Sequence, residues 1–321
     1  MNKISSSNLD FIGDIHGHAD ELMELLEKLG YSNSGGFYQH PSRKVFFCGD
    51  FIDRGPKVKE ALQIVKGMIV NDSAYTVIGN HEYNAICYHT IVDGKPLRGH
   101  SHENAKQHRY TLEALAHDEL QEYISWFKTL PIYHDNGNFK IVHAQWEQEY
   151  VDQLQAKAIN DFSDERFLIE SANKSAAEYK LVDCLLKGRE IQRPGIYFRD
   201  KGGKKRNVYR IKWWKQGKLL SKDALFEFPQ DNDEVMPFEL MGIEQSVPLF
   251  FGHYCLKDEK PVLQSNIACC LDFCVAKNGL LAAYRWDGEQ ELVPGKFLQA
   301  DSREKQMSLT AQEDGASILT A

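Results

Sequence analysis

The stretch CGDFIDRGP, residues 48 to 56, places two acids and a base directly after an apolar run. The run, VFFC, leads into Gly49, and Asp50, Asp53 and Arg54 follow within five positions. Burying an unpaired charge costs free energy, so a buried strand seldom ends this way unless a charged ligand lies beside it. This strand end therefore predicts a binding site.

Composition limits the protein classes that the chain fits. Its 321 residues are 42% hydrophobic and 26% charged, which is typical of a globular protein with a sizeable core. The net charge of −8 argues against a dedicated nucleic-acid-binding protein. No apolar run approaches the ~20 residues of a membrane span, and MNKISSSNLDF is not typical of a signal peptide. We expect a cytoplasmic protein with one large domain, residues 1–300, and a loose tail, residues 301–321.

The seven cysteines are an odd number and include no CxxC pair. Cys48, Cys269, Cys270 and Cys274 lie in apolar, strand-like stretches. We interpret them as reduced core residues rather than disulfide partners or zinc ligands.

Apolar periodicity predicts alternating strands and helices in the first half of the chain. Strands are expected at 8–13, 44–48 and 74–78, with helices at 18–29, at 57–70 and after His81. This alternation indicates an α/β fold with largely parallel strands. Further along, the expected elements are helices at 113–128 and 150–187, strands at 139–143, 249–253, 266–273 and 280–286, and a β-hairpin from residue 194 that turns at Gly202 and Gly203.

Five of the predicted strands end in polar residues of the metal-ligand type. The first three are followed by GDIHG, GDFIDRG and GNHE, and the two later ones end in His143 and His253. In open α/β sheets, ligands bind beyond the carboxyl ends of the strands, where the loops converge. The sequence therefore predicts that all five strand ends contribute to one site.

The chemistry of the predicted site follows from its oxygen and imidazole donors. Such donors, with no thiolate among them, suit Mn, Fe or Zn better than an iron–sulfur cluster, and the histidines argue against a pure Mg or Ca site. Six ligands exceed what one catalytic ion needs, and would serve two ions roughly 3.5–4 Å apart that share a bridging carboxylate. The six candidates are Asp14, His16, Asp50, Asn80, His143 and His253.

Taken together, GDIHG, GDFIDRG, GNHE and the two later histidines resemble the calcineurin-like metallophosphoesterases. The resemblance is strongest to the phosphoprotein-phosphatase branch, which includes serine/threonine phosphatases and bacterial symmetrical diadenosine tetraphosphatases. It covers residues 8–287, and its motifs are specific through residue 82. The resemblance implies a two-sheet β-sandwich flanked by helices, here with a helical insertion and a β-hairpin insertion.

The resemblance also implies roles for individual residues. Asp14 and His16 would hold the first ion, Asp50 would bridge, and the second ion would be held by Asn80, His143 and His253. Asn80 would also touch the substrate phosphate. His81 would be the general acid, oriented by Asp53, and Arg54 would clamp phosphate through its planar guanidinium. The implied cofactors are two divalent ions, with Mn²⁺ favoured and Fe, Zn or Ni as alternatives.

Two features depart from the family pattern. His143 lies in HAQW rather than before two glycines, and Tyr254 follows His253. A second phosphate-binding arginine is expected between these histidines, and the choice among Lys187, Arg189, Arg193 and Arg199 stays open.

Two other stretches have competing interpretations. His100, His102 and His108 could form an extra metal site or a lid, but a solvated loop and helix start is favoured. The stretch KGGKKRNVYRIKWWK could meet nucleic acid by charge and stacking, or contact substrate. A hairpin with an aromatic packing face is favoured over nucleic acid because the whole chain is acidic.

Three functions are compatible with these residues. The first is a two-metal phosphomonoesterase that uses a metal-bound hydroxide on phosphoproteins or small phosphoesters. The second is a symmetrical diadenosine tetraphosphate hydrolase, and the third is an inactive, metal-stabilised binding protein. The presence of His81 and all six candidate ligands argues against the third. The oligomeric state is not predicted.

Overall fold

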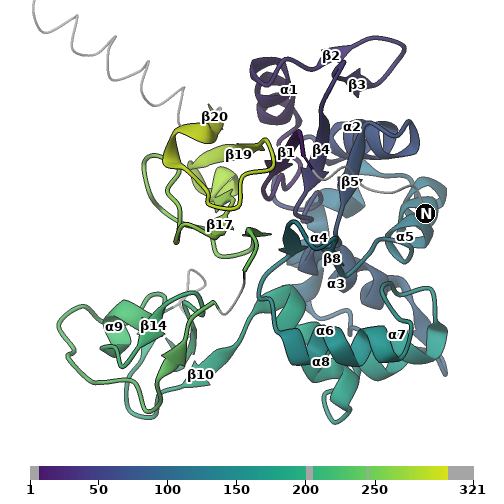
Figure 1. Cartoon of the computed structure of the whole chain (residues 1–321). Coiled ribbons are helices and arrows are strands. Elements are labelled where there is room, and N and C mark those ends of the chain that lie inside the picture. The colour runs from purple at the N-terminus through teal and green to yellow at the C-terminus, as the bar shows by residue number, and fades with distance from the viewer. Residues whose placement is uncertain (1–6, 200–204, 244–245, 303–321) are drawn as a thin grey trace, which may run out of the picture.

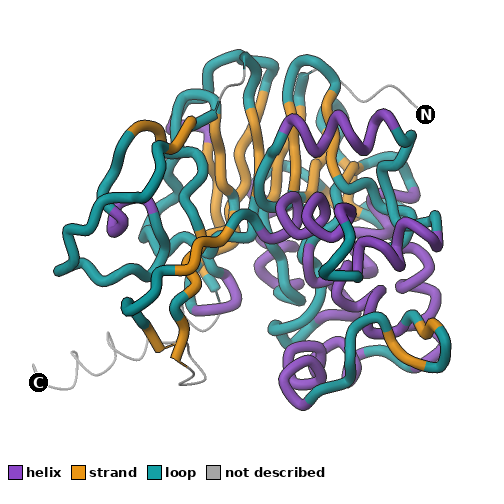
Figure 2. Tube along the Cα trace, turned by 90° about the horizontal axis from the view of Figure 1, so that it is seen from below, coloured by secondary structure: helices purple, strands orange, loops and turns teal. Residues whose placement is uncertain are grey.

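The protein is described here by a computed structural model that covers residues 7–199, 205–243 and 246–302. Its centre is a pair of β-sheets, and Figure 2 shows helices crowding one flank of the strands. The expected α/β sandwich is confirmed.

The first sheet is mixed and has the order β18-β19-β1-β4-β5, with β20 pairing on β19. Strands β1, β4 and β5 are parallel to one another, and β19 runs antiparallel to β1. The six strands are β1 (Leu9–Ile12), β4 (Lys44–Phe47), β5 (Ala74–Thr76), β18 (Asp272–Phe273), β19 (Leu280–Trp286) and β20 (Phe297–Asp301).

The second sheet has the order β17-β16-β9-β8. Strand β16 is parallel to both neighbours, while β8 and β9 form an antiparallel pair. Its strands are β8 (Tyr133–Asp135), β9 (Lys140–Val142), β16 (Leu249–Phe251) and β17 (Ala268–Cys270). Residues 266–273 were expected to form one strand, which is wrong: β17 and β18 belong to different sheets, so the chain crosses the sandwich at Leu271.

Aromatic side chains fill the space between the two sheets. Phe11 of β1 stacks on Phe250 of β16 with ring centroids 3.6 Å apart, and it also contacts Phe46, Phe139 and Trp286. All five rings are buried. Because successive strand residues face opposite sides, this packing fixes the register that points the strand ends toward one edge.

Helices cover the outer faces, and most of them carry leucine, valine or isoleucine on their buried sides. In Figure 1, α1 and α2 lie beside the first sheet, and α6, α7 and α8 form a group farther along the chain. The helices are α1 (Ala19–Lys28), α2 (Val58–Val70), α3 (Asn80–His89), α4 (His102–Ala114), α5 (His117–Phe127), α6 (Gln148–Ala156), α7 (Glu165–Ala172), α8 (Ala177–Lys187) and α9 (Ser221–Ala224). None of the helices in the described residues has the length and apolar character needed to cross a membrane.

Residues 190–199 and 205–243 form an insert lobe that projects beside the helices (Figure 1). Its strands are β10 (Glu190–Gln192), β11 (Phe198–Arg199), β12 (Lys205–Arg206), β13 (Val208–Arg210), β14 (Gln216–Gly217) and β15 (Leu240–Met241). Strands β11 and β12 pair antiparallel as the predicted hairpin does, while Gly202 and Gly203 lie outside the described residues. Trp213 and Trp214 pack against Phe251, which supports the packing interpretation of this stretch. Most of the predicted tail, 303–321, also lies outside the described residues.

Minor hairpins complete the fold: β2 (Ser32–Asn33) with β3 (Tyr38–Gln39), and β6 (Ile91–Val92) with β7 (Lys95–Pro96). Two 3₁₀ turns, η1 (Val275–Lys277) and η2 (Pro294–Lys296), flank β19.

Candidate metal centre

The ends of β1, β4, β5, β9 and β16 lie at one edge of the sandwich. A cavity of about 240 Å³ opens there. Its lining includes five of the six candidate ligands: Asp14, His16, Asp50, Asn80 and His253. His143, the sixth, is fully buried directly beneath, with its Nε2 3.0 Å from Asn80 Oδ1.

Asp50 occupies the centre of this arrangement. Its Oδ2 lies 3.6 Å from His16 Nε2, and its Oδ1 lies 3.5 Å from His143 Nε2. Two groups of nitrogen and carboxylate donors share Asp50: one with His16 and His81, the other with His143 and His253. This geometry places Asp50 between two potential ion positions.

The histidines are oriented so that one ring nitrogen points to the site. His16 Nδ1 donates to the Ile52 carbonyl at 3.0 Å, and His143 Nδ1 donates to the Cys48 carbonyl at 2.7 Å. Each Nε2 is then directed at the donors of the site, the orientation in which a metal-bound imidazole would use it. The backbone carbonyls that set these tautomers come from the same CGDFI stretch.

Asn80 and Asp14 connect the remaining donors. Asn80 Oδ1 lies 2.7 Å from His253 Nδ1, so it faces both late histidines. The Asp14 carboxylate accepts from the His253 backbone N–H at 3.1 and 3.2 Å. Gly79, rather than Asn80, is the N-cap of α3, so Asn80 belongs to the first helical turn.

Glu82 holds the loop that carries Asp50. Its buried carboxylate accepts from the backbone N–H groups of Asp50, Phe51, Ile52 and Gly79 at 2.8–3.3 Å. A Cβ on Gly79 would lie 2.2 Å from Asp50 Oδ1, so only glycine allows this approach. Glu82 is part of the GNHE motif, but the sequence alone did not indicate this role.

Non-glycine residues with positive φ are concentrated at the site. They include His16 (φ 47°), Asp50 (54°), Asp53 (67°) and His253 (71°). Each such residue costs of order 1–3 kcal/mol and persists only where its surroundings fix it. These backbone conformations direct the side chains of the site into one cavity.

The electrostatics of the site favour cations. Burial, followed by the negative charge of Asp272, raises the pKa of Asp14 well above its ordinary value. Burial, followed by the positive charge of Arg54, lowers the pKa of His16 well below its ordinary value. Burial lowers the pKa of His143, but the negative charge of Asp50 outweighs it and raises this pKa to about 10. Imidazole nitrogens beside crowded buried carboxylates form a donor set that fits divalent ions.

Asp53 and His81 form a second constellation at the edge of the site. Asp53 Oδ2 accepts from His81 Nδ1 at 2.6 Å, and His81 Nε2 lies 3.1 Å from Arg54 Nη2. A guanidinium can only donate, so His81 Nε2 accepts and its proton lies on Nδ1. Burial raises the pKa of Asp53, but hydrogen bonds from His108 and then His81 outweigh it and hold this pKa well below its usual range.

The cations around the cavity differ from those proposed from sequence. Lys187 does line it, but Arg189 pairs with Glu147, Arg193 pairs with Glu234, and Arg199 lies in β11. Arg210 of β13 lines the cavity instead and lies 3.4 Å from the His253 carbonyl through Nη1. Lys277 also lines the cavity. Sequence reasoning missed Arg210 because it lay within the stretch interpreted as a packed hairpin.

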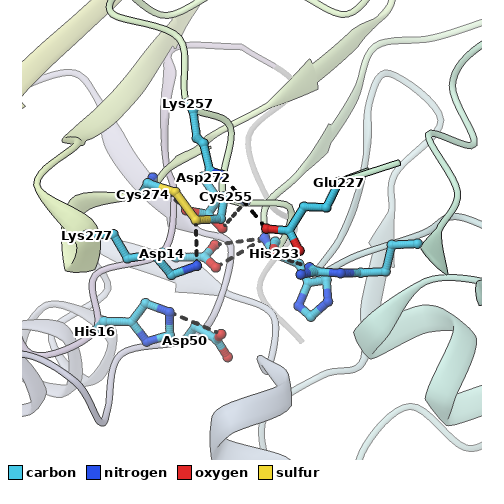
Figure 3. Close-up of a disulfide and its surroundings, with 11 residues drawn as sticks. Asp14, His16, Asp50, Glu227, His253, Cys255, Lys257, Asp272, Cys274 and Lys277 are labelled. Atoms are coloured by element: carbon cyan, nitrogen blue, oxygen red, sulfur yellow. Dashed lines mark hydrogen bonds and ion pairs between the residues drawn. A yellow bond between two sulfur atoms is a disulfide. The ribbon is translucent and has the colours of Figure 1, made fainter. Parts of the chain in front are cut away.

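A disulfide joins Cys255 to Cys274 at the rim of the cavity (Figure 3). The interpretation of Cys274 as a reduced core residue is therefore wrong, whereas Cys48, Cys269 and Cys270 are buried free thiols as predicted. Asp272 supports the link by accepting from the Cys255 and Cys274 backbone N–H groups at 2.6 and 3.0 Å. The sequence analysis did not identify Asp272 as a residue of the site. Its position in the apolar stretch NIACCLDF could have indicated that this acid has a specific role.

The histidine-rich stretch at 100–108 also needs correction. His100 and His102 are exposed, as the solvated-loop interpretation predicted, but His108 is 5% exposed and contacts Asp53. No group of metal ligands in the described residues includes any of the three.

Two bacterial relatives are similar to part of the chain. A protein from Halalkalibacterium halodurans, named bis(5′-nucleosyl)-tetraphosphatase PrpE [asymmetrical], is 41% identical over 138 residues, covering 41% of this chain and 54% of the relative. One of the same name from a Geobacillus species is 32% identical over 147 residues, covering 44% and 59%. The chain thus matches little more than half the length of these relatives.

A solved structure and a family model extend the comparison. A Saccharomyces cerevisiae serine/threonine phosphatase with similarity to human phosphatase PP5 superposes with a TM-score of 0.51 at 13% identity. The match covers 94% of this chain and 81% of that one, and it indicates a shared fold. The family model described as calcineurin-like phosphoesterase matches residues 8–184, more than half of the 321 residues. The chain therefore belongs to the calcineurin-like phosphoesterase family.

Proposed function

We propose that the chain is a phosphoester hydrolase that works with two divalent ions, Mn²⁺ favoured. The observation that carries this proposal is the convergence of six nitrogen and oxygen donors on a cavity that Arg54 and Arg210 also line. Asp14 and His16 would hold one ion, Asp50 would bridge, and Asn80, His143 and His253 would hold the other. When bound, such ions would stabilise charge on the phosphoryl oxygens and lower the pKa of the attacking water.

The protein's own side chains would bind the substrate and supply the proton. Arg54 and Arg210 would clamp the phosphoryl oxygens, because a planar guanidinium matches them in geometry and charge. Without substrate, Arg54 donates to His81 Nε2, so this nitrogen is engaged. A phosphoryl group offers Arg54 stronger acceptors, which frees Nε2 to carry the proton that the leaving oxygen takes. Asp53 would keep His81 aimed through Nδ1.

The test of this proposal is metal-dependent hydrolysis. Protein purified without added metal would be analysed for bound ions and then assayed on p-nitrophenyl phosphate before and after exhaustive chelation. We expect activity to vanish on chelation and to return best with Mn²⁺. Full activity after chelation would overturn the proposal.

A second candidate is hydrolysis of a dinucleoside tetraphosphate. The relative that is 41% identical over 138 residues carries that activity in its name, in its asymmetrical form. Products separate the possibilities: two nucleoside diphosphates indicate symmetrical cleavage, and a triphosphate with a monophosphate indicates asymmetrical cleavage. A phosphopeptide in the same panel tests the phosphoprotein alternative.

The cytoplasmic location and the division into a domain at 1–300 and a tail at 301–321 remain predictions. The Cys255–Cys274 disulfide counts against a reducing compartment. Labelling of free thiols in protein taken directly from cells, with and without prior reduction, would show whether the link exists there.

A further inference from the structure

Helix α4 buries an unusual pair of side chains. The only buried residues among its thirteen, His102–Ala114, are His108 and Thr111. Both are polar, and they lie three positions apart on one face of the helix. Most surface helices bury an apolar stripe, whereas the apolar side chains of this helix that pack against the core, Tyr110 and Ala114, are only partly buried.

Both buried side chains contact Asp53. His108 Nδ1 lies 2.9 Å from Asp53 Oδ1, and Thr111 Oγ1 donates to the same oxygen at 2.6 Å. Thr111 Oγ1 also accepts from the Asp53 backbone N–H at 3.1 Å. The other carboxylate oxygen, Oδ2, receives His81 Nδ1 at 2.6 Å. One oxygen of Asp53 is therefore held by α4 and the other faces His81.

The far side of His108 is also fixed. Its Nε2 lies 3.1 Å from Nε2 of His89, the last residue of α3. Burial, followed by the charge of His108, lowers the pKa of His89 to about 4. A neutral His89 can share a single proton with His108 Nε2. The chain His81–Asp53–His108–His89 thus joins the beginning of α3 to its end through α4.

We propose that His108 and Thr111 are positioning residues that hold Asp53 in the orientation that aims His81 at the leaving group. The inference rests on the proposed hydrolase function and deepens it. A carboxylate that is free to rotate would present either oxygen, or neither, to His81. Two donors on Oδ1 remove that freedom, and a displacement of about 1 Å at a catalytic group costs on the order of 10²-fold in rate.

The alternative is a purely structural role, in which the two donors only satisfy a buried carboxylate. The two roles differ in their dependence on the leaving group. If His108 and Thr111 act through His81, their loss matters when the leaving oxygen needs a proton, and matters little when it does not. A purely structural defect lowers the rate on every substrate alike.

The experiment compares variants that remove or retain the donor. His108→Leu and Thr111→Val remove it with little change in size, whereas His108→Asn and Thr111→Ser keep a donor near the same place. His102→Leu makes the first change at an exposed site on the same helix. The bound metal and the melting temperature of each variant are first compared with those of the wild type. Then kcat and KM are measured on phenyl phosphate and on p-nitrophenyl phosphate.

We expect His108→Leu and Thr111→Val to lower kcat on phenyl phosphate by roughly 10- to 100-fold with KM little changed. The loss should be smaller on p-nitrophenyl phosphate, and His108→Asn, Thr111→Ser and His102→Leu should stay near the wild type. In a His81→Asn background, adding Thr111→Val should change the rate by no more than about twofold, because residues that act as one unit are not additive.

Equal losses of kcat on the two esters would overturn the inference. So would a loss from Thr111→Val that is as large in the His81→Asn background as in the wild type. If His108→Leu does not fold, the kinetics of the near-isosteric variant Thr111→Val decide between the positioning role and a purely structural role. A wild-type protein without metal-dependent hydrolysis would instead contradict the proposed function. In that case the ¹H NMR signal of the His81 Nδ1–H proton, assigned by its absence in His81→Asn, still tests the positioning role. Its chemical shift should change in Thr111→Val and stay the same in Thr111→Ser. An unchanged chemical shift in both variants would overturn the positioning role.

Discussion

The floor and the wall of the cavity are built in different ways. The floor consists of the six donors at the strand ends, and its central residues are buried: Asp14 and Asp50 are each 2% exposed, and His143 is 0% exposed. The wall consists of Lys187, Arg210, Lys277 and the Cys255–Cys274 disulfide, which come from helix, lobe and loop. The floor is fixed by parallel strands and by the backbone hydrogen bonds to Glu82, whereas the wall depends on segments packed from outside. On the proposed hydrolase function, we therefore expect the floor to set the chemistry and the wall to set the choice of substrate.

The largest expected effect beyond loss of metal comes from the edge of the floor. His81→Asn should lower kcat by ~10²–10⁴-fold on substrates with poor leaving groups, as loss of a general acid does. The loss should shrink on p-nitrophenyl phosphate, whose leaving group hardly needs a proton. His81 also lies with His16 and Asp50 in a group that could hold a metal ion. Equal losses of kcat on alkyl and aryl esters would therefore indicate that His81 is a metal ligand rather than the general acid.

A smaller effect is expected from the wall. Arg210→Ala should raise KM about 10- to 100-fold, since charge-assisted hydrogen bonds contribute about 1.5–3 kcal/mol each, and should leave bound metal unchanged. Arg54→Ala should behave similarly. Arg189→Ala is the matched control, because Arg189 pairs with Glu147 and does not line this cavity. Loss of metal from Arg210→Ala would show that floor and wall are not separable.

The disulfide should affect stability more than chemistry. It closes a loop with a sequence separation of 19, for which the chain-entropy model gives about 3 kcal/mol. Reduction, or Cys255→Ser, should lower the free energy of unfolding by roughly that amount in denaturant titrations. Identical unfolding curves with and without reductant would show that the link does not form in solution.

The smallest effect is expected from the tail. Removing residues 303–321, which lie outside the described residues, should leave hydrolysis and the melting temperature unchanged, because the stretch contains no motif and has weak periodicity. A truncated protein that loses metal or melts earlier would show that the tail is docked on the domain.

The sequence was informative about the floor for a physical reason. Each donor follows its strand within a few residues, and parallel strands bring their carboxyl ends to one edge, so local motifs are enough to predict convergence. Arg210 could not be placed this way, because its position depends on β10 pairing with β13 across the lobe. The same holds for Cys255 and Cys274, which meet because the chain crosses between the sheets at Leu271. His108 was misjudged because nothing local showed that a helix outside the sandwich would reach Asp53.

The central claim is that the two acids of CGDFIDRGP differ in kind. Asp50 lies between two groups of potential ligands, whereas Asp53 contacts His81, His108 and Thr111. The most direct measurement is the metal stoichiometry of Asp50→Asn and Asp53→Asn beside the wild type. We predict two ions per chain in the wild type and in Asp53→Asn, and one or none in Asp50→Asn, because loss of the bridging charge leaves repulsion between the cations uncompensated. An empty site in Asp53→Asn with two ions retained in Asp50→Asn would contradict this assignment.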